Sequence, residues 1–369
     1  MNTDKVLIFV LAVCLVVALA FKQKDDKMEQ EVKNTKSLFD ETTIGKMKLK
    51  NRFVRASVGD DTPTGEVLDK TVERYEQLAK GGVGTILTGY TLIDASERNM
   101  GILSMYDDRF ISGAKRLADV AHQYGSNILM QLVYVGSEFH RDPSLAHNIL
   151  GASAVRNLHT GLTPKEMSHE DIKRVIGEFA DAAVRAKKAG FDGIEIHACH
   201  GYLLHQFASP YYNRRTDEYG GNRENRYRLT LEVYKAIRQA VGKDFQVWIK
   251  VQCQDSELKD ADGNILSKGV TNEDCLYLCR ELAKLGIDAI EVSGNFQDFR
   301  GNKAFFRDIA DKIAAETSLP IIVTGGNRDY EEMERMINET HIRYVGMARP
   351  LLAHPDLINK FADEYHAKK

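Results

Sequence analysis

The sequence predicts an α/β fold, a closed (β/α)8 TIM barrel, and three observations support this prediction. From Leu38 onward, eight apolar strand-like runs alternate with eight helical patterns, which is the order that builds a parallel sheet. Polar or small residues follow most of the runs at the same end, where barrel enzymes keep their active sites. No early Gly-x-Gly-x-x-Gly turn is present, which counts against a doubly wound sheet.

The expected strands are short runs rich in Val, Ile and Leu that stop at polar or glycine residues. In chain order they cover residues 52–57, 85–91, 128–135, 193–197, 246–251, 289–293, 321–324 and 344–347.

The expected helices lie between these runs and after the last one. They cover residues 69–80, 108–124, 170–189, 226–241, 272–285, 304–316, 330–339 and 355–365. Two of them begin at capping boxes, Ser168 with Asp171 and Thr271 with Asp274. Glycines such as Gly190 and Gly286 follow the last helical residues and suit the left-handed turn that ends a helix.

A hydrophobic segment, residues 1–21, precedes the barrel, and residues 6–21 are almost unbroken apolar. This run is shorter than the roughly 20 residues that a spanning helix needs. It is therefore either an N-terminal anchor helix or a signal peptide cleaved after Ala18-Leu19-Ala20. The lysines that follow favour a cytoplasmic barrel. We expect a membrane-associated protein with a polar tether at 22–36 and a barrel at 37–369, and cleavage remains open.

Composition limits the function. The net charge is −3 and both signs of charge are mixed along the chain, which argues against a nucleic-acid surface. The five cysteines show no paired framework, so we interpret them as free thiols in a reducing compartment.

The ends of the predicted strands carry the candidate site residues. They are Ala56, Ser57 and Val58 after the first strand, Tyr90 after the second, Gln131 on the third, His197, His200 and Tyr202 after the fourth, Lys250 on the fifth, Gly325 and Gly326 after the seventh, and Ala348 and Arg349 after the eighth. The loops after strands seven and eight often hold a phosphate in barrels. Gly325-Gly326 alone would suggest an ordinary tight turn, but Arg349 one strand later favours a phosphate site.

One stretch also carries a family resemblance. It contains His-Ala-x-His-Gly-Tyr-Leu from His197, Asn-x-Arg-x-Asp-x-Tyr-Gly-Gly from Asn213, and Glu-Asn-Arg from Glu224. From residue 38 to about residue 362, the chain resembles the old yellow enzyme family of FMN-dependent NAD(P)H oxidoreductases, and its bacterial branch most closely. Longer members of that family carry a cysteine-rich iron–sulfur extension, and we expect this protein to resemble the members without it.

The resemblance implies roles for the strand-end residues. Ala56, Ser57 and Val58 would line the flavin and Gln131 would hydrogen-bond its pyrimidine ring. Lys250 stands where the family usually has arginine, so it would keep the positive charge near the reduced flavin and lose the planar fork. Gly59, Ser57 and Ala348 also depart from common family residues, which leaves the flavin potential and substrate range open.

The implied reaction is reduction of the C=C bond of an α,β-unsaturated carbonyl compound. His197 and His200 would polarise the carbonyl oxygen, and Tyr202 would protonate the α-carbon. NADH or NADPH would be the hydride donor in a ping-pong cycle, and the resemblance also makes a homo-oligomer an expectation.

Three alternatives stay open. A flavin-free barrel could be a Schiff-base lyase that uses Lys250. It could also be a metal-dependent hydrolase with His197, His200 and His205 as zinc ligands, although we expect no metal. A third possibility is a tethered flavin-binding protein without turnover. We further expect Glu195 to face away from the histidines as an ion-pair partner, whereas Trp248 and the pair Tyr211-Tyr212 could belong to the core or to the substrate entrance.

Overall fold

The computed structural model describes residues 35–139, 149–259, 263–294 and 304–367. Residues 38–369 form one compact unit. The hydrophobic segment at 1–21 and most of the tether lie outside the described residues, so the anchor and localisation remain predictions. Within the described part of the chain, we find no helix with the length and apolar character needed to cross a membrane.

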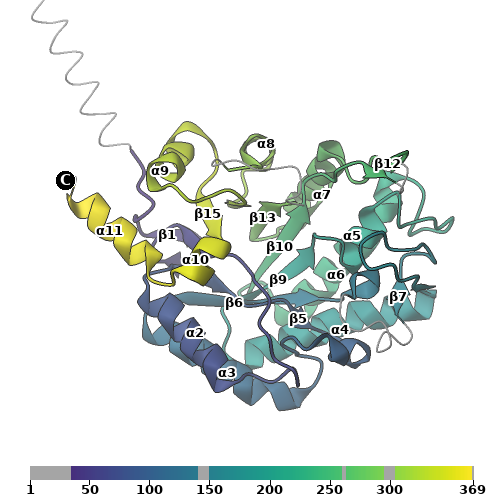
Figure 1. Cartoon of the computed structure of the whole chain (residues 1–369), viewed down its shortest axis with the longest axis horizontal. Helices are drawn as coiled ribbons and strands as arrows, with labels where there is room; N and C mark the ends of the chain where they lie inside the picture. Colours follow the sequence, from purple (N-terminus) through teal and green to yellow (C-terminus); the bar gives the residue numbers. More distant parts are fainter. Residues whose placement is uncertain (1–34, 140–148, 260–262, 295–303, 368–369) are drawn as a thin grey trace, which may run out of the picture. The chain divides into compact units, whose positions relative to one another are not determined.

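Eight parallel strands close into a barrel, as predicted (Figure 1). Each strand pairs in parallel with the next, and the eighth pairs with the first. In chain order they are β3 (Phe53–Arg55), β4 (Thr85–Leu87), β6 (Asn127–Val133), β9 (Gly193–Ala198), β10 (Gln246–Gln252), β13 (Ala289–Ser293), β14 (Ile321–Thr324) and β15 (Tyr344–Met347).

The long helices follow these strands and pack around the barrel (Figure 1). They are α2 (Asp69–Lys80), α3 (Ile111–Gln123), α4 (His169–Lys188), α6 (Arg223–Val241), α7 (Asn272–Leu285), α8 (Arg307–Thr317), α9 (Tyr330–Glu339) and α11 (Leu357–Ala367). Both predicted capping boxes are present, at the starts of α4 and α7. Apolar residues between these helices and the outer face of the barrel form the largest core cluster.

A hairpin that we did not predict contributes to the interior of the barrel. Strands β1 (Thr42–Ile44) and β2 (Met47–Leu49) pair antiparallel. Their side chains cluster with inward-facing residues of the barrel strands, including Val54, Trp248 and Ile322. Trp248 is fully buried there and donates a hydrogen bond from Nε1 to Gln246 Oε1 at 3.0 Å. Trp248 therefore belongs to the core and not to the substrate entrance.

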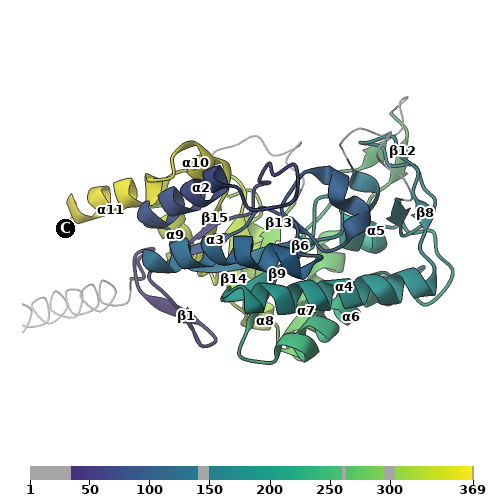
Figure 2. The same ribbon diagram turned by 90° about the horizontal axis from the view of Figure 1, so that it is seen from below.

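Short elements inserted after the strands build the opposite end of the barrel. They include β5 (Thr91–Leu92), the pair β7 (Leu150–Gly151) and β8 (Lys165–Glu166), α5 (Leu203–Ala208), the hairpin β11 (Leu258–Lys259) and β12 (Ile265–Ser267), and α10 (Arg349–Ala353). Figure 2 shows β12 and the β1 hairpin at opposite ends of the barrel. The insertions thus lie on the side to which the carboxyl ends of the strands point.

Candidate functional site

Two histidines and a tyrosine meet where β9 ends. His197 is on the strand, His200 is in the following turn, and Tyr202 caps the start of α5. The ring of His197 lies 5.3 Å from that of His200 and 4.8 Å from that of Tyr202 between centroids, edge to face in both cases. The cluster predicted from the sequence is therefore assembled.

The backbone of His200 has a conformation that non-glycine residues rarely adopt, with φ of +60°. Neighbouring strands hold it in place. The N–H of His200 donates to Gln252 Oε1 at 3.1 Å, and its Nε2 lies 3.4 Å from Ser293 Oγ. Gln252 and Ser293 end β10 and β13. A strained turn at this point aims the imidazole across the mouth of the barrel.

Burial sets the protonation states of the three rings. It holds the pKa of His197 well below its usual range, and the nearby His200 and Lys250 act in the same direction. Burial also lowers the pKa of His200 to about 3. Burial and the neighbouring Tyr90 raise the pKa of Tyr202 well above its usual range. At neutral pH the site therefore holds two neutral imidazoles, each with one N–H to donate, and a protonated phenol.

Tyr90 and Gly59 complete this corner of the site. The ring of Tyr90 lies 5.5 Å from that of Tyr202. A Cβ on Gly59 would lie 2.9 Å from Tyr90 Cε1, closer than real contacts allow. Glycine at position 59, one of the departures from the family pattern, therefore leaves the space that Tyr90 occupies.

A buried group of ionisable side chains lies inside the barrel just below the histidines. Lys250 Nζ is 3.0 Å from Glu291 Oε1, and both side chains are almost completely buried. Gln131 Nε2 donates to Glu195 Oε2 at 2.6 Å. Two carboxyl groups thus share the interior with one ammonium group. The two carboxyl groups cannot both be ionised without a large cost in free energy.

The carboxyl of Glu195 resolves this conflict by keeping its proton. Burial, and then repulsion by Glu291, raises the pKa of Glu195 well above its usual range. Burial disfavours the charge on Lys250, yet the attraction of Glu291 and Glu195 outweighs it and raises the pKa of Lys250. The group is therefore an ion pair, Lys250 with Glu291, beside a neutral Glu195.

Our expectation for Glu195 was wrong in one respect. Glu195 and His197 are two residues apart on β9 and so share the inward face of the strand. The ion-pair role that we assigned to Glu195 belongs to Glu291. The signal that would have found Glu291 is its place in β13 between Ile290 and Val292, which pack in the outer core and so leave Glu291 on the inward face.

The lyase alternative does not fit this arrangement. A Schiff-base lysine must be a free amine, which requires a lowered pKa. Lys250 has a raised pKa and an ion-pair partner. It is suited to act as a fixed charge and not as a nucleophile.

Several buried polar atoms near the ends of the strands have no hydrogen-bond partner among the described residues. They are Ser57 Oγ, Gln131 Oε1, His197 Nδ1 and Thr324 Oγ1. Buried polar atoms without partners are rare and costly, and these four come from four different barrel strands or the residues just beyond them. Their chemistry fits a flat polar ligand laid over the barrel mouth, as a flavin would be.

The predicted phosphate residues follow β14 and β15. Gly325 and Gly326 both have positive φ, of 135° and 80°. The side chain of Asn327 ties this turn to both strands through Val323 O at 2.8 Å and Gly346 O at 2.9 Å. A Cβ on Gly325 would lie 2.9 Å from the ring of Phe306, so packing also requires glycine here. Ala348 and Arg349 start α10, with the Arg349 side chain on the surface.

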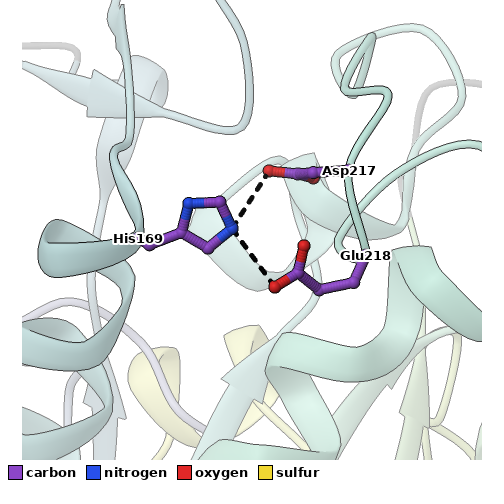
Figure 3. Close-up of side chains that lie close together, drawn as sticks. All are labelled: His169, Asp217 and Glu218. Carbon is purple, nitrogen blue, oxygen red and sulfur yellow. Dashed lines mark ion pairs between the residues drawn. The ribbon is translucent and has the colours of Figure 1, made fainter.

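His205 does not join the other histidines as a metal ligand. Its Nδ1 accepts from the N–H of Gly201 at 2.9 Å, and its Nε2 lies 3.0 Å from Asp255 Oδ1. Both ring nitrogens are thus engaged. Within the described ranges, the one group of three potential ligands is His169, Asp217 and Glu218 (Figure 3), which lies on the surface where Asp217 is already paired with Arg215. This geometry does not favour the hydrolase alternative.

A cavity of about 600 Å³ opens beside the histidines. His200, Gly201 and Tyr212 border it on one side, and Leu158, Ser256 and Leu258 on another. Tyr212 is therefore at the entrance, whereas Tyr211 is buried. The size suits a small organic substrate.

The match to a family model decides what this barrel is related to. Residues 37–367 match the NADH:flavin oxidoreductase / NADH oxidase family. The chain belongs to this family. The predicted resemblance to the old yellow enzymes is thereby confirmed.

Individual relatives of this family agree with the match. The chain is 35% identical to a metal reductase of Desulforamulus reducens over 88% of its own length, and 32% identical to a cinnamate reductase of Clostridium sporogenes over 89%. It spans about half the length of these curated relatives, 48% and 53%. A solved structure of morphinone reductase in complex with tetrahydroNAD aligns with a TM-score of 0.74 and 25% identity, covering 89% of this chain and 90% of that one.

Proposed function

We propose that this protein is an FMN-dependent NAD(P)H oxidoreductase that reduces the C=C bond of α,β-unsaturated carbonyl compounds. The observation that carries the proposal is the cluster of His197, His200 and Tyr202 at the end of β9, two neutral N–H donors beside a protonated phenol. The family match supports the flavin and the nicotinamide donor. The names of two relatives, cinnamate reductase and morphinone reductase, are consistent with this substrate class.

The residues that would hold FMN come from most of the strand ends. They are Ala56, Ser57, Val58, Tyr90, Gln131, Lys250, Gly325, Gly326, Ala348 and Arg349, with the unpaired Ser57 Oγ and Gln131 Oε1 among their polar atoms. FMN would supply the hydride, after accepting it from NADH or NADPH. The charge of Lys250 is shared with Glu291, so the cation facing the flavin is weaker than an unpaired arginine would be.

The protein's own part in the reduction is to bind the carbonyl oxygen and to deliver a proton. His197 and His200 donate hydrogen bonds to the oxygen, which stabilises the negative charge that develops there when hydride reaches the β-carbon. Tyr202 gives its proton to the α-carbon. NAD(P)H and one proton are consumed for each alkene reduced, so the phenol regains its proton from solvent.

The test separates the two half-reactions of the FMN-loaded protein by stopped-flow absorbance. Tyr202→Phe should slow oxidation of the reduced flavin by an α,β-unsaturated ketone by roughly 100-fold or more, because it removes the general acid. Reduction of the flavin by NAD(P)H should stay within about twofold. Tyr124→Phe, which removes a hydroxyl at the far end of α3, is the matched control. Equal alkene rates in the two variants would refute the role of Tyr202.

A further inference from the structure

A second, cationic cavity lies outside the barrel, between α2 and the segment that joins α10 to α11. It measures about 190 Å³. Three cationic side chains line it, Arg55, Lys70 and Arg74, against one carboxylate, Glu73. Leu351 and Leu352 of α10 form part of the opposite wall. The lining thus carries an excess of two positive charges.

Arg55 gives this cavity a buried and poorly satisfied cation. The residue is only 2% exposed. Its guanidinium has five N–H donors, and within the described ranges it makes one hydrogen bond, from Nη1 to the carbonyl oxygen of Leu87. The ring of Tyr75 lies under it at 5.6 Å. A buried charge is costly unless it is paired, and the described carboxylates leave Arg55 without an ion pair within 4 Å.

Three carboxylates near this region already have partners, and one of these partners is Arg74 of the cavity lining. Asp60 accepts from Arg74 Nη1 at 2.9 Å and from the hydroxyl of Tyr75 at 2.6 Å. At the edges of the cavity, Asp69 pairs with Arg116, and Asp356 pairs with Lys360 at 3.0 Å. Glu73 is exposed on α2. Among the described residues, Arg74 therefore has a partner in Asp60, whereas no carboxylate forms an ion pair with Arg55 or Lys70.

The walls of the cavity are fixed in place. A Cβ on Gly81, at the end of α2, would lie 1.8 Å from Pro355 O, so the helix and the α10–α11 connection are in direct backbone contact. Asn359 adds two hydrogen bonds, from its N–H to Gly81 O at 3.1 Å and from Nδ2 to Lys80 O at 2.9 Å. The cavity is a built feature and not a gap between mobile loops.

We propose that this cavity binds a tetrahedral oxyanion, either free phosphate or the phosphate group of a small ester. A guanidinium can bind two phosphate oxygens at once, and Lys70 and Arg74 of α2 line the same cavity. The site differs from the flavin site. Val54 faces the barrel interior, so Arg55, the next residue of β3, faces the opposite side of the sheet.

The test is titration of the FMN-loaded protein, in which the flavin phosphate site is already filled, with inorganic phosphate and with glycerol 3-phosphate. Saturable binding is expected by calorimetry or 31P NMR, and the tighter of the two ligands identifies the source of the phosphate group. Leu352→Glu places a carboxylate on the cavity wall and should weaken binding at least tenfold. Leu352 is 49% exposed, so this variant should fold and keep its FMN.

The matched control is Leu266→Glu on β12, where a leucine of similar exposure, 41%, lies outside the cavity lining. It should leave binding unchanged. Arg55→Lys keeps the charge but loses the planar fork, and should weaken binding by a smaller factor than Leu352→Glu. Absence of saturable binding of both ligands, or equal binding by the Leu352→Glu and Leu266→Glu variants, would overturn the proposal.

Discussion

The two halves of the barrel interior differ sharply although the same strands build both. The half nearer the amino ends of the strands is apolar, with Trp248, Val54 and Ile322 packed against the β1–β2 hairpin. The half nearer the carboxyl ends holds the ion pair of Lys250 with Glu291 and the neutral Glu195. Strand β10 changes from one character to the other between Trp248 and Lys250, two residues apart on the same face.

This difference shows how one fold separates stability from chemistry. Apolar burial in the lower half stabilises the barrel at any pH. Buried charges in the upper half cost free energy unless they are paired, and their cost depends on how many protons they hold. We therefore expect the lower half to determine the stability of the barrel, and the upper half to determine how that stability varies with pH.

The largest expected effect comes from the lower half. Trp248→Ala removes the largest fully buried side chain of the barrel and leaves a cavity that the closed strands cannot fill. We expect a loss of about 3–5 kcal/mol in the free energy of unfolding, measured by urea denaturation. The loss should be the same at pH 5 and pH 8, because the indole of Trp248 packs against apolar side chains and donates to the uncharged Gln246. A loss that changes by more than about 1 kcal/mol between the two pH values would break the comparison between the halves.

The next effect belongs to the upper half and depends on pH. The pKa of Glu195 is raised in the folded protein, so its contribution to stability is complete below the pKa of the unfolded chain and is lost as the pH rises toward the folded pKa. The amide of Glu195→Gln does not titrate, so the variant lacks this pH-dependent loss of stability. The variant should gain stability relative to the wild type above about pH 4.3, by up to about 1.4 kcal/mol per pH unit.

The measurement for Glu195 is the difference in unfolding free energy between wild type and variant from pH 5 to pH 8. Other titrating groups, such as the buried Glu97 with its pKa raised to about 8 by burial, are common to both proteins and cancel. A flat difference for Glu195→Gln would mean that Glu195 is ionised in the folded barrel.

Sequence patterns predicted the helices and strands of the barrel better than its interior. Three of the eight helices, α2, α7 and α9, and the strands β13, β14 and β15 have the residue bounds expected from periodicity, because local capping and alternation determine them. The β1–β2 hairpin was missed because its role depends on contacts with strands that lie far away in the chain.

Site residues that lie in one short stretch of sequence were predicted, whereas site residues brought together from different strands were missed. His197, His200 and Tyr202 lie within six residues of sequence, so their clustering was visible. Glu291, Ser293 and Gln252 lie on other strands, and only barrel closure brings them to Lys250 and His200. Polar residues at inward positions of otherwise apolar strands were the available signal, and we applied it to Lys250 but not to β13.

The smallest expected effect tests whether the upper half also positions the catalytic residues. Gln252 Oε1 accepts from the N–H of His200, whose backbone is in the left-handed region, and Gln252 Nε2 donates to Asp255 Oδ1 at 2.9 Å. Gln252→Leu removes these two bonds, together with the bond from Cys199 Sγ and the bond to Gln254 O, so the imidazole of His200 should be aimed less well at the substrate oxygen. We expect alkene reduction by the reduced flavin to slow about tenfold, or about 1.4 kcal/mol in the barrier, while flavin reduction by NAD(P)H is unchanged. Gln123→Leu on the exposed end of α3 is the control for loss of an amide side chain.

Equal slowing of both half-reactions would show that Gln252 supports the fold as a whole. Selective slowing of the alkene step would show that the polar half of the barrel holds His200 in its reactive position.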